Sequence, residues 1–219
     1  MSTVVDYIVV ADSGETAEKK FAELRYVEMQ TVMSDGSKGE PQKLIILMRK
    51  GIDAVVALPY ARVGAQVLVA LRAGQRAAVW LRRHMPLAVA EPNAPALLWE
   101  CVAGVREWED KGEEGLRHRA REELEEEIGI AVEESRLQPL GPGAFPSPGM
   151  YPERIFFFAV ELTENELRSA HAQGDGSSSE AGADVRVLTL KDALRECRSG
   201  VITDQKTELA LRRLADLVP

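Results

Sequence analysis

Cysteine, histidine, aromatic residues and long apolar runs are all scarce in this 219-residue chain. Its two cysteines, Cys101 and Cys197, lie far apart without metal-ligand spacing, which excludes a disulfide framework and favours buried free thiols in a reducing cytoplasm. No apolar run approaches the roughly 18 residues that cross a bilayer, so we expect no membrane partner. The first residues also lack the basic region and apolar core of an export signal.

Positive charge is in deficit as well. The chain has 27 Lys and Arg against 35 Asp and Glu, a net charge of −8 at pH 7. This balance argues against a nucleic acid polymer as partner, because such binding depends on neutralising phosphates with basic side chains. If the ligand carries phosphate, the site is expected to recruit its own cation.

Short runs rich in Val, Ile and Phe intermingle with helical patterns without regular alternation, which predicts a mixed sheet between helices. The predicted strands are Tyr7–Val10, Leu44–Arg49, Ala54–Leu58, Val67–Arg72, Ala77–Arg82, Leu97–Val102, Arg154–Leu162 and Val185–Leu190. The predicted helices are Glu15–Leu24, Gly112–Ile128, Glu164–Ala170, Leu190–Arg198 and Asp204–Leu217, with Thr163, Glu166 and Asp204 as caps. Residues 1–50 are predicted to form a β-rich N-terminal arm, and residues 51–219 the main domain.

The most informative segment is the glutamate-rich helix at residues 112–128. Its apolar stripe recurs every four residues, at Leu116, Ala120, Leu124 and Ile128. Glu123 and Glu127 share one edge of that stripe, with Glu126 just beyond them, and like charges at this spacing repel. Hard oxygen ligands of this kind suit Mg²⁺ or Mn²⁺, whereas the alternative is a solvated acidic face.

The residues around this helix resemble the signature of the Nudix hydrolases, Gly-x5-Glu-x7-Arg-Glu-U-x-Glu-Glu-x-Gly-U, where U is aliphatic. Anchored at Gly129 and Ile130, the pattern aligns with Glu114, Glu123, Leu124, Glu126 and Glu127. Two features depart from it. The segment from Gly104 to Glu114 is four residues too long, with the extra residues expected in 106–111, and Glu122 stands where the motif has Arg. Arg119, one turn before Glu123, is a candidate substitute.

Three further segments resemble the branch that acts on ADP-ribose and other nucleoside diphosphate sugars. They are Glu100-x-x-Ala103-Gly104, the Ser-Pro-Gly loop within Pro146–Glu153, and Gly200-x-Ile-x-Asp-x-Lys-Thr207 before the last helix. The resemblance implies a Nudix-like α/β/α sandwich and Mg²⁺-dependent hydrolysis of a nucleoside diphosphate sugar. It also implies a homodimer that uses the N-terminal arm.

The same resemblance implies a set of site residues. Metal ligands would be the side chains of Glu123, Glu126 and Glu127 and the carbonyl of Ala103. The general base would be a carboxylate on the Gly/Ser-rich segment, Glu180 or Asp184, with the spacing favouring Glu180. Glu114 is a helper carboxylate or a helix-start residue, and the substrate-binding residues are Arg82, Glu100, Gly104 and Gly149.

Three alternatives stay open at this point. The same chemistry could act on dinucleoside polyphosphates, coenzyme A or nucleoside triphosphates. A Nudix-like module that lost turnover together with the motif Arg would bind ligand without cleaving it. A scaffold protein with a merely soluble acidic helix would bind no metal.

Overall fold

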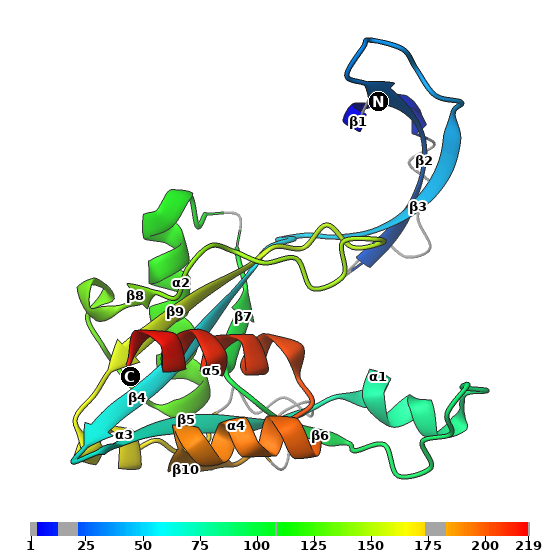
Figure 1. Cartoon of the computed structure of the whole chain (residues 1–219). Helices are drawn as coiled ribbons and strands as arrows, with labels where there is room; N and C mark the ends of the chain where they lie inside the picture. The colour runs from blue at the N-terminus through cyan, green and yellow to red at the C-terminus, as the bar shows by residue number, and fades with distance from the viewer. Residues whose placement is uncertain (1–3, 13–21, 108, 174–182, 219) are drawn as a thin grey trace. The chain divides into compact units, whose positions relative to one another are not determined.

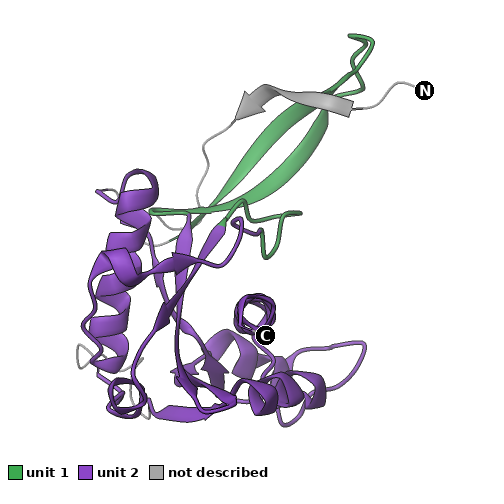
Figure 2. Ribbon diagram, turned by 60° about the vertical axis from the view of Figure 1, so that its left-hand side comes forward, with its two compact units in different colours: residues 1–52, 145–154 green, residues 53–144, 155–219 purple. Residues whose placement is uncertain are grey.

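The chain forms two compact units, distinguished by colour in Figure 2, in a computed structural model that describes residues 4–12, 22–107, 109–173 and 183–218. The first unit comprises Met1–Ile52 and Phe145–Arg154, and the second Asp53–Ala144 and Ile155–Pro219. In the described part of the chain, no helix has the length and apolar content needed to cross a membrane.

The first unit is built on an antiparallel sheet of three described strands, in the order β1 (Val4–Asp12), β2 (Ala22–Met33) and β3 (Gln42–Arg49). A turn between β2 and β3 places Gly36 at φ +82°, a left-handed conformation that glycine adopts without strain. Loop 145–154 belongs to this unit, because Leu47 N–H donates to the Met150 carbonyl (2.9 Å) and Arg49 pairs with Glu153. The predicted β-rich N-terminal arm is confirmed.

The predicted helix Glu15–Leu24 is wrong where the structure describes it. Residues 22–24 open β2, while residues 13–21 lie outside the described part of the chain. The segment Ala22–Met33 contains many good helix formers, which hid the strand from sequence reasoning. Pairing with β1 on one edge and β3 on the other overrides that local propensity.

The second unit contains a mixed sheet that has seven strands among the described residues. They are β4 (Ala54–Val63), β5 (Gln66–Gln75), β6 (Leu97–Glu100), β7 (Val102–Val105), β8 (Gln138–Pro139), β9 (Ile155–Glu161) and β10 (Val185–Thr189). The order is β10-β5-β4-β9-β8, with β6 paired to β5 and β7 to β4. Only the β4–β9 pair is parallel among the described ladders, so the predicted mixed sheet is confirmed.

Helices cover both faces of this sheet (Figure 1). Alternate residues of β4 point to opposite sides: Val55 packs with α2 (Gly112–Ile128) and α3 (Glu164–Arg168), and Val56 with α4 (Leu190–Ser199) and α5 (Gln205–Leu217). Both valines are fully buried. The result is the predicted α/β/α sandwich, completed by the short elements α1 (Ala77–Trp80), η1 (Leu81–His84) and η2 (Glu134–Arg136).

Two strand predictions need correction. The segment Ala77–Arg82 is helical, in α1 and η1, and not a strand. Its side chains bury no core, and local bonds such as Trp80 N–H to the Arg76 carbonyl (3.0 Å) satisfy its backbone without a neighbouring strand. The run Leu97–Val102 is two strands, β6 and β7, separated at Cys101. The other predicted strands and helices are confirmed within a few residues at their ends.

The break at Cys101 occurs where β4 and β5 separate. These strands pair with each other only from Tyr60↔Val69 to Val63↔Gln66. Beyond that stretch, β5 pairs with β6 and β4 pairs with β7. The chain therefore changes its pairing partner from β5 to β4 at Cys101. The Cys101 N–H is there satisfied by the buried Thr207 hydroxyl (2.8 Å). This fork brings residues 100–104 beside α2 and the start of α5.

Candidate active site

Helix α2 presents two glutamates to the fork. Leu116, Ala120, Leu124 and Ile128 are buried against the sheet, as the four-residue spacing predicts. The helix ends at Gly129, whose φ of +69° is the left-handed conformation in which helices commonly terminate at glycine. Glu123 and Glu127, on the edge of the buried stripe, keep only 14% and 19% of their side-chain surface exposed.

Strand β7 packs directly against these two carboxylates. The Ala103 N–H donates to Glu127 Oε2 (3.4 Å). A Cβ atom built on Gly104 would overlap the Glu123 carboxylate, so only glycine allows Glu123 to lie against the strand here. The structure therefore brings together four predicted site residues, Ala103, Gly104, Glu123 and Glu127.

Burial and like charge make the ionised forms of both glutamates unfavourable. Burial, followed by the charge of Glu127, raises the pKa of Glu123 from 4.5 to about 7, although Arg119 acts in the opposite direction. Burial also raises the pKa of Glu127, while Arg72 and the Ala103 N–H partly offset that effect. Two desolvated acids one helical turn apart thus form a site at which added positive charge is favourable.

Glu123, Glu126 and Glu127 form an acidic edge of α2, and their carboxylate oxygens are ligands that a hard divalent cation prefers. Glu126 is exposed at the end of this edge, and its charge contributes to the raised pKa of Glu123. Among the described residues, however, no three His, Cys, Asp or Glu side chains already converge to hold an ion. Joint binding of an ion by Glu123, Glu126 and Glu127 therefore requires a side-chain rotation, which Glu126 can make because it is exposed.

A layer of basic residues faces the glutamates across the fork. Arg72 Nη1 lies 3.3 Å from Glu127 Oε1, and the Arg72 side chain is 10% exposed. Arg76 binds Glu100 with two hydrogen bonds, one of them from Nε to Oε1 (3.0 Å). Lys206 Nζ lies 3.2 Å from Glu100 Oε1. Glu100, 5% exposed, therefore holds two cations beside the acidic edge.

Sequence reasoning missed Arg72 and Arg76, although a signal existed. Arg72 and Glu100 are cross-strand partners, and Arg76 follows directly after β5. Basic side chains at even spacing on a strand that leads to a suspected site would have identified both, because alternate residues share a face. Lys206 lies within the segment quoted for the resemblance.

The start of α5 anchors this basic layer. Asp204 caps the helix by accepting from Thr207 N–H (2.9 Å), and it also lies 3.0 Å from Lys206 Nζ. Burial raises the pKa of the Cys101 thiol to about 12, which disfavours the reactive thiolate form. The expected buried free thiol is confirmed for Cys101, whereas Cys197 is only partly buried.

A solved structure shares this fold. It is described as an ADP compounds hydrolase, and it matches with a TM-score of 0.56 over 99% of this chain and 93% of that chain, at 10% identity. No protein-family model matches the sequence, and no curated protein matches it either. At this identity the likeness establishes the architecture, and the predicted Nudix-like α/β/α sandwich is confirmed.

Arg119 is a buried cation beside the acidic edge. Its Nη1 lies 3.1 Å from Glu122 Oε2 and 3.9 Å from Glu123 Oε1. Arg119, which the sequence suggested as a substitute for the motif Arg, thus lies beside the expected metal ligand Glu123. Glu114 is exposed in the first turn of α2, where the helix dipole stabilises a negatively charged side chain.

For the remaining predicted residues that it describes, the structure shows no contact with Glu123 or Glu127. Arg82 is in η1, where its guanidinium pairs with Glu91 (2.7 and 2.6 Å). Gly149 belongs to the first unit. Glu180 lies outside the described residues. Its rival Asp184 stands just before β10, and its carbonyl accepts from Ala73 N–H (2.8 Å).

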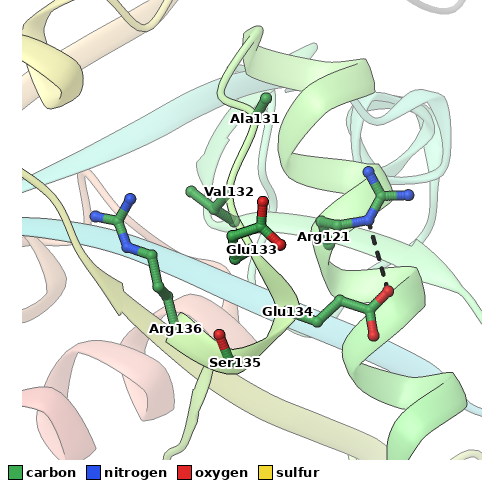
Figure 3. A pocket seen from close by; sticks show the side chains of 7 residues that line it. All are labelled: Arg121, Ala131, Val132, Glu133, Glu134, Ser135 and Arg136. Carbon is green, nitrogen blue, oxygen red and sulfur yellow. Dashed lines mark ion pairs between the residues drawn. The ribbon is translucent and has the colours of Figure 1, made fainter.

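A polar cavity of about 780 Å³ lies on the other flank of α2 (Figure 3). It is lined by Arg121, Ala131, Val132, Glu133, Glu134, Ser135 and Arg136, and Arg121 and Glu134 are paired across it (3.8 Å). A second hollow of about 400 Å³ lies between the β4–β5 turn and α4. Neither contains a predicted site residue, so the candidate site rests on the residues of the fork.

Proposed function

We propose that this chain is a Nudix-type hydrolase that cleaves the pyrophosphate bond of ADP-ribose or another nucleoside diphosphate sugar with Mg²⁺. The products are a nucleoside monophosphate and a sugar phosphate. One observation carries the proposal: two largely buried glutamates lie against strand β7, Glu123 at Gly104 and Glu127 at Ala103, opposite a basic layer. The shared fold with an ADP compounds hydrolase supports the substrate class.

The acidic edge would hold the metal. Glu123, Glu126 and Glu127 supply carboxylate oxygens, and the Ala103 carbonyl is the proposed backbone ligand, with Mn²⁺ as a substitute for Mg²⁺. A bound divalent ion neutralises phosphate oxygens and makes water a stronger nucleophile. Burial and the charge of Glu127 raise the pKa of Glu123, and a bound cation would oppose both effects and so favour the ionised form of this carboxylate.

The basic layer would bind the diphosphate. Arg72 pairs with Glu127 in the described structure, and a phosphate oxygen can replace that carboxylate as its partner. Glu100 fixes Arg76 and Lys206 through ion pairs, so these cations are already oriented before substrate arrives. Gly104 allows close approach to the backbone. Arg82, Gly149 and the general base Glu180 remain predictions from the resemblance.

Hydrolysis of a substrate panel tests this proposal. ADP-ribose, other nucleoside diphosphate sugars, dinucleoside polyphosphates, coenzyme A and nucleoside triphosphates are incubated with Mg²⁺ or with chelator, and products are separated by chromatography. Glu127→Gln keeps the side-chain size but removes the charge, so turnover should fall by at least about a hundredfold. Glu125→Gln, on the exposed face of α2, is the matched control. Equal rates for Glu127→Gln and wild type would refute the ligand assignment.

A ligand-binding module without turnover is the second candidate. Two observations favour it: Glu122 replaces the motif Arg, and no three acidic side chains of the described part converge on a metal position. Thermal stabilisation by ADP-ribose, with no monophosphate released at any Mg²⁺ concentration, would decide for this alternative.

The arm of residues 1–50 is proposed to form a homodimer in the cytoplasm. Tyr26 and Ile45 are cross-strand partners in its sheet, and each keeps about half of its surface exposed (47% and 50%). A second copy of the chain would cover this apolar pair.

A further inference from the structure

The two departures from the Nudix signature meet in the structure. Residues 106–111 contain the extra length between Gly104 and Glu114, and Glu122 replaces the motif Arg. Both contact the guanidinium of Arg119. The longer loop reaches it through Asp110, and Glu122 reaches it from the next turn of α2.

Described residues of the longer loop make close contacts with Asp110. Its carboxylate accepts from Glu107 N–H (2.8 Å), and its carbonyl accepts from Arg106 Nη1 (2.7 Å). The backbone of Asp110 lies so close to the start of α2 that a Cβ atom on Gly115 would overlap it. Only 4% of the Asp110 side chain is exposed, so the loop delivers a buried carboxylate to a fixed place.

That carboxylate orients Arg119. The Arg119 Nε donates to Asp110 Oδ2 at 3.0 Å, which fixes one edge of the planar guanidinium. The opposite corner, Nη1, then points at Glu122 (3.1 Å) and Glu123 (3.9 Å). With Gly104 on its other side, the Glu123 carboxylate is confined between a strand and a charged group.

We propose that Arg119, held by Asp110 of the longer loop, is a positioning residue that orients Glu123 for metal binding in place of the missing motif Arg. The longer loop and the lost Arg are then compensating changes. This inference rests on the proposed function, since it assigns Glu123 a metal to bind. Arg119 acts through Glu123 and does not itself contact the substrate.

Two conservative variants of the full-length chain test it. Arg119→Lys keeps the positive charge but loses the planar fork that binds Asp110 and Glu123 together. Asp110→Asn keeps an oxygen acceptor and the size of the side chain while removing the charge that fixes Arg119. The matched controls are Arg121→Lys, on the other flank of α2, and Glu109→Gln, the exposed neighbour of Asp110.

Four quantities are measured for each protein: Mn²⁺ affinity by titration calorimetry, kcat and KM for ADP-ribose, and the Glu123 side-chain position in a crystal structure. Loss of an outer-shell partner typically lowers metal affinity or activity by about 10–100-fold. We expect that loss in Mn²⁺ affinity and kcat for both variants, with KM changed far less. Both controls should match wild type, and Glu123 should leave its wild-type rotamer in the two variants.

The outcomes separate this inference from the proposed function. Wild-type affinity and kcat in both variants would overturn the inference and leave the function intact. A wild-type protein that neither binds Mn²⁺ nor cleaves any substrate would overturn the function. The crystal structures would then still decide the positioning role: an unmoved Glu123 in Arg119→Lys and Asp110→Asn overturns it, and a displaced Glu123 supports it.

Discussion

Replacement of Glu123 by Gln is expected to make the protein more stable at high pH and no more stable at low pH. Burial and the charge of Glu127 raise the pKa of Glu123 from 4.5 to about 7 in the folded chain. Between these values the folded state binds more protons than the unfolded state, so wild-type stability falls as pH rises from 4.5 through about 7. Glutamine resembles the protonated acid and does not titrate.

The size of the effect follows from the pKa. One pKa unit corresponds to about 1.4 kcal/mol, so ionisation of Glu123 withdraws about 3 kcal/mol of unfolding free energy by pH 8. For a chain of this length that is a difference of about 6–12 °C in melting temperature. Because an ion that binds only the folded state stabilises it, Mg²⁺ at about 100 times its Kd should add about 2.7 kcal/mol to wild type. Glu123→Gln should gain much less.

Urea unfolding followed by tryptophan fluorescence measures this difference, since all three tryptophans belong to the second unit by sequence. Wild type, Glu123→Gln and the exposed-site control Glu125→Gln are compared at intervals from pH 4.5 to 8. The advantage of Glu123→Gln should grow with pH and be absent near pH 4.5. A variant no more stable than wild type at pH 8, or an advantage independent of pH, would refute the reasoning.

Two further predictions follow from named contacts. Gly104→Ala adds a Cβ atom that overlaps the Glu123 carboxylate, so turnover should fall about a hundredfold, as expected for a misplacement of about 1 Å. The unfolding free energy should fall by no more than about 3 kcal/mol, because the backbone at Gly104 is not left-handed and alanine can adopt it. Unchanged kinetics would contradict the close contact between Gly104 and Glu123. Ile45→Glu places a charge in the exposed apolar pair with Tyr26 and should shift sedimentation velocity from dimer to monomer. A dimer that persists in Ile45→Glu would show that the interface lies elsewhere.

Helix α2, which carries the candidate site, was predicted from the sequence with its correct first and last residues. Its apolar stripe recurs every four residues and Gly129 ends it, so periodicity and capping agree. Thr163 and Asp204 were predicted as caps for the same reason, and both cap their helices. Helices and caps of this kind can be predicted from the sequence, because the residues that determine their conformation are neighbours in the chain.

Features that depend on distant partners were not predictable in this way. Strand β2 contains good helix formers and is held by two neighbouring strands. The cations Arg72 and Arg76 acquire their roles only when β6 pairs beside β5 and brings Glu100 to them. Asp110 lies nine residues before Arg119, and nothing in their spacing indicates that the loop folds back on the helix.

The crossing at Cys101 ties two chemical halves of the site to one short peptide. Glu100, which holds the cations, and Ala103, which contacts Glu127, are three residues apart, or at most about 10 Å along an extended chain. Because each end is locked into a different strand, neither half can move far without the other. The interval between the basic and the acidic groups is therefore set by the covalent chain, and a ligand that contacts both groups must match that length.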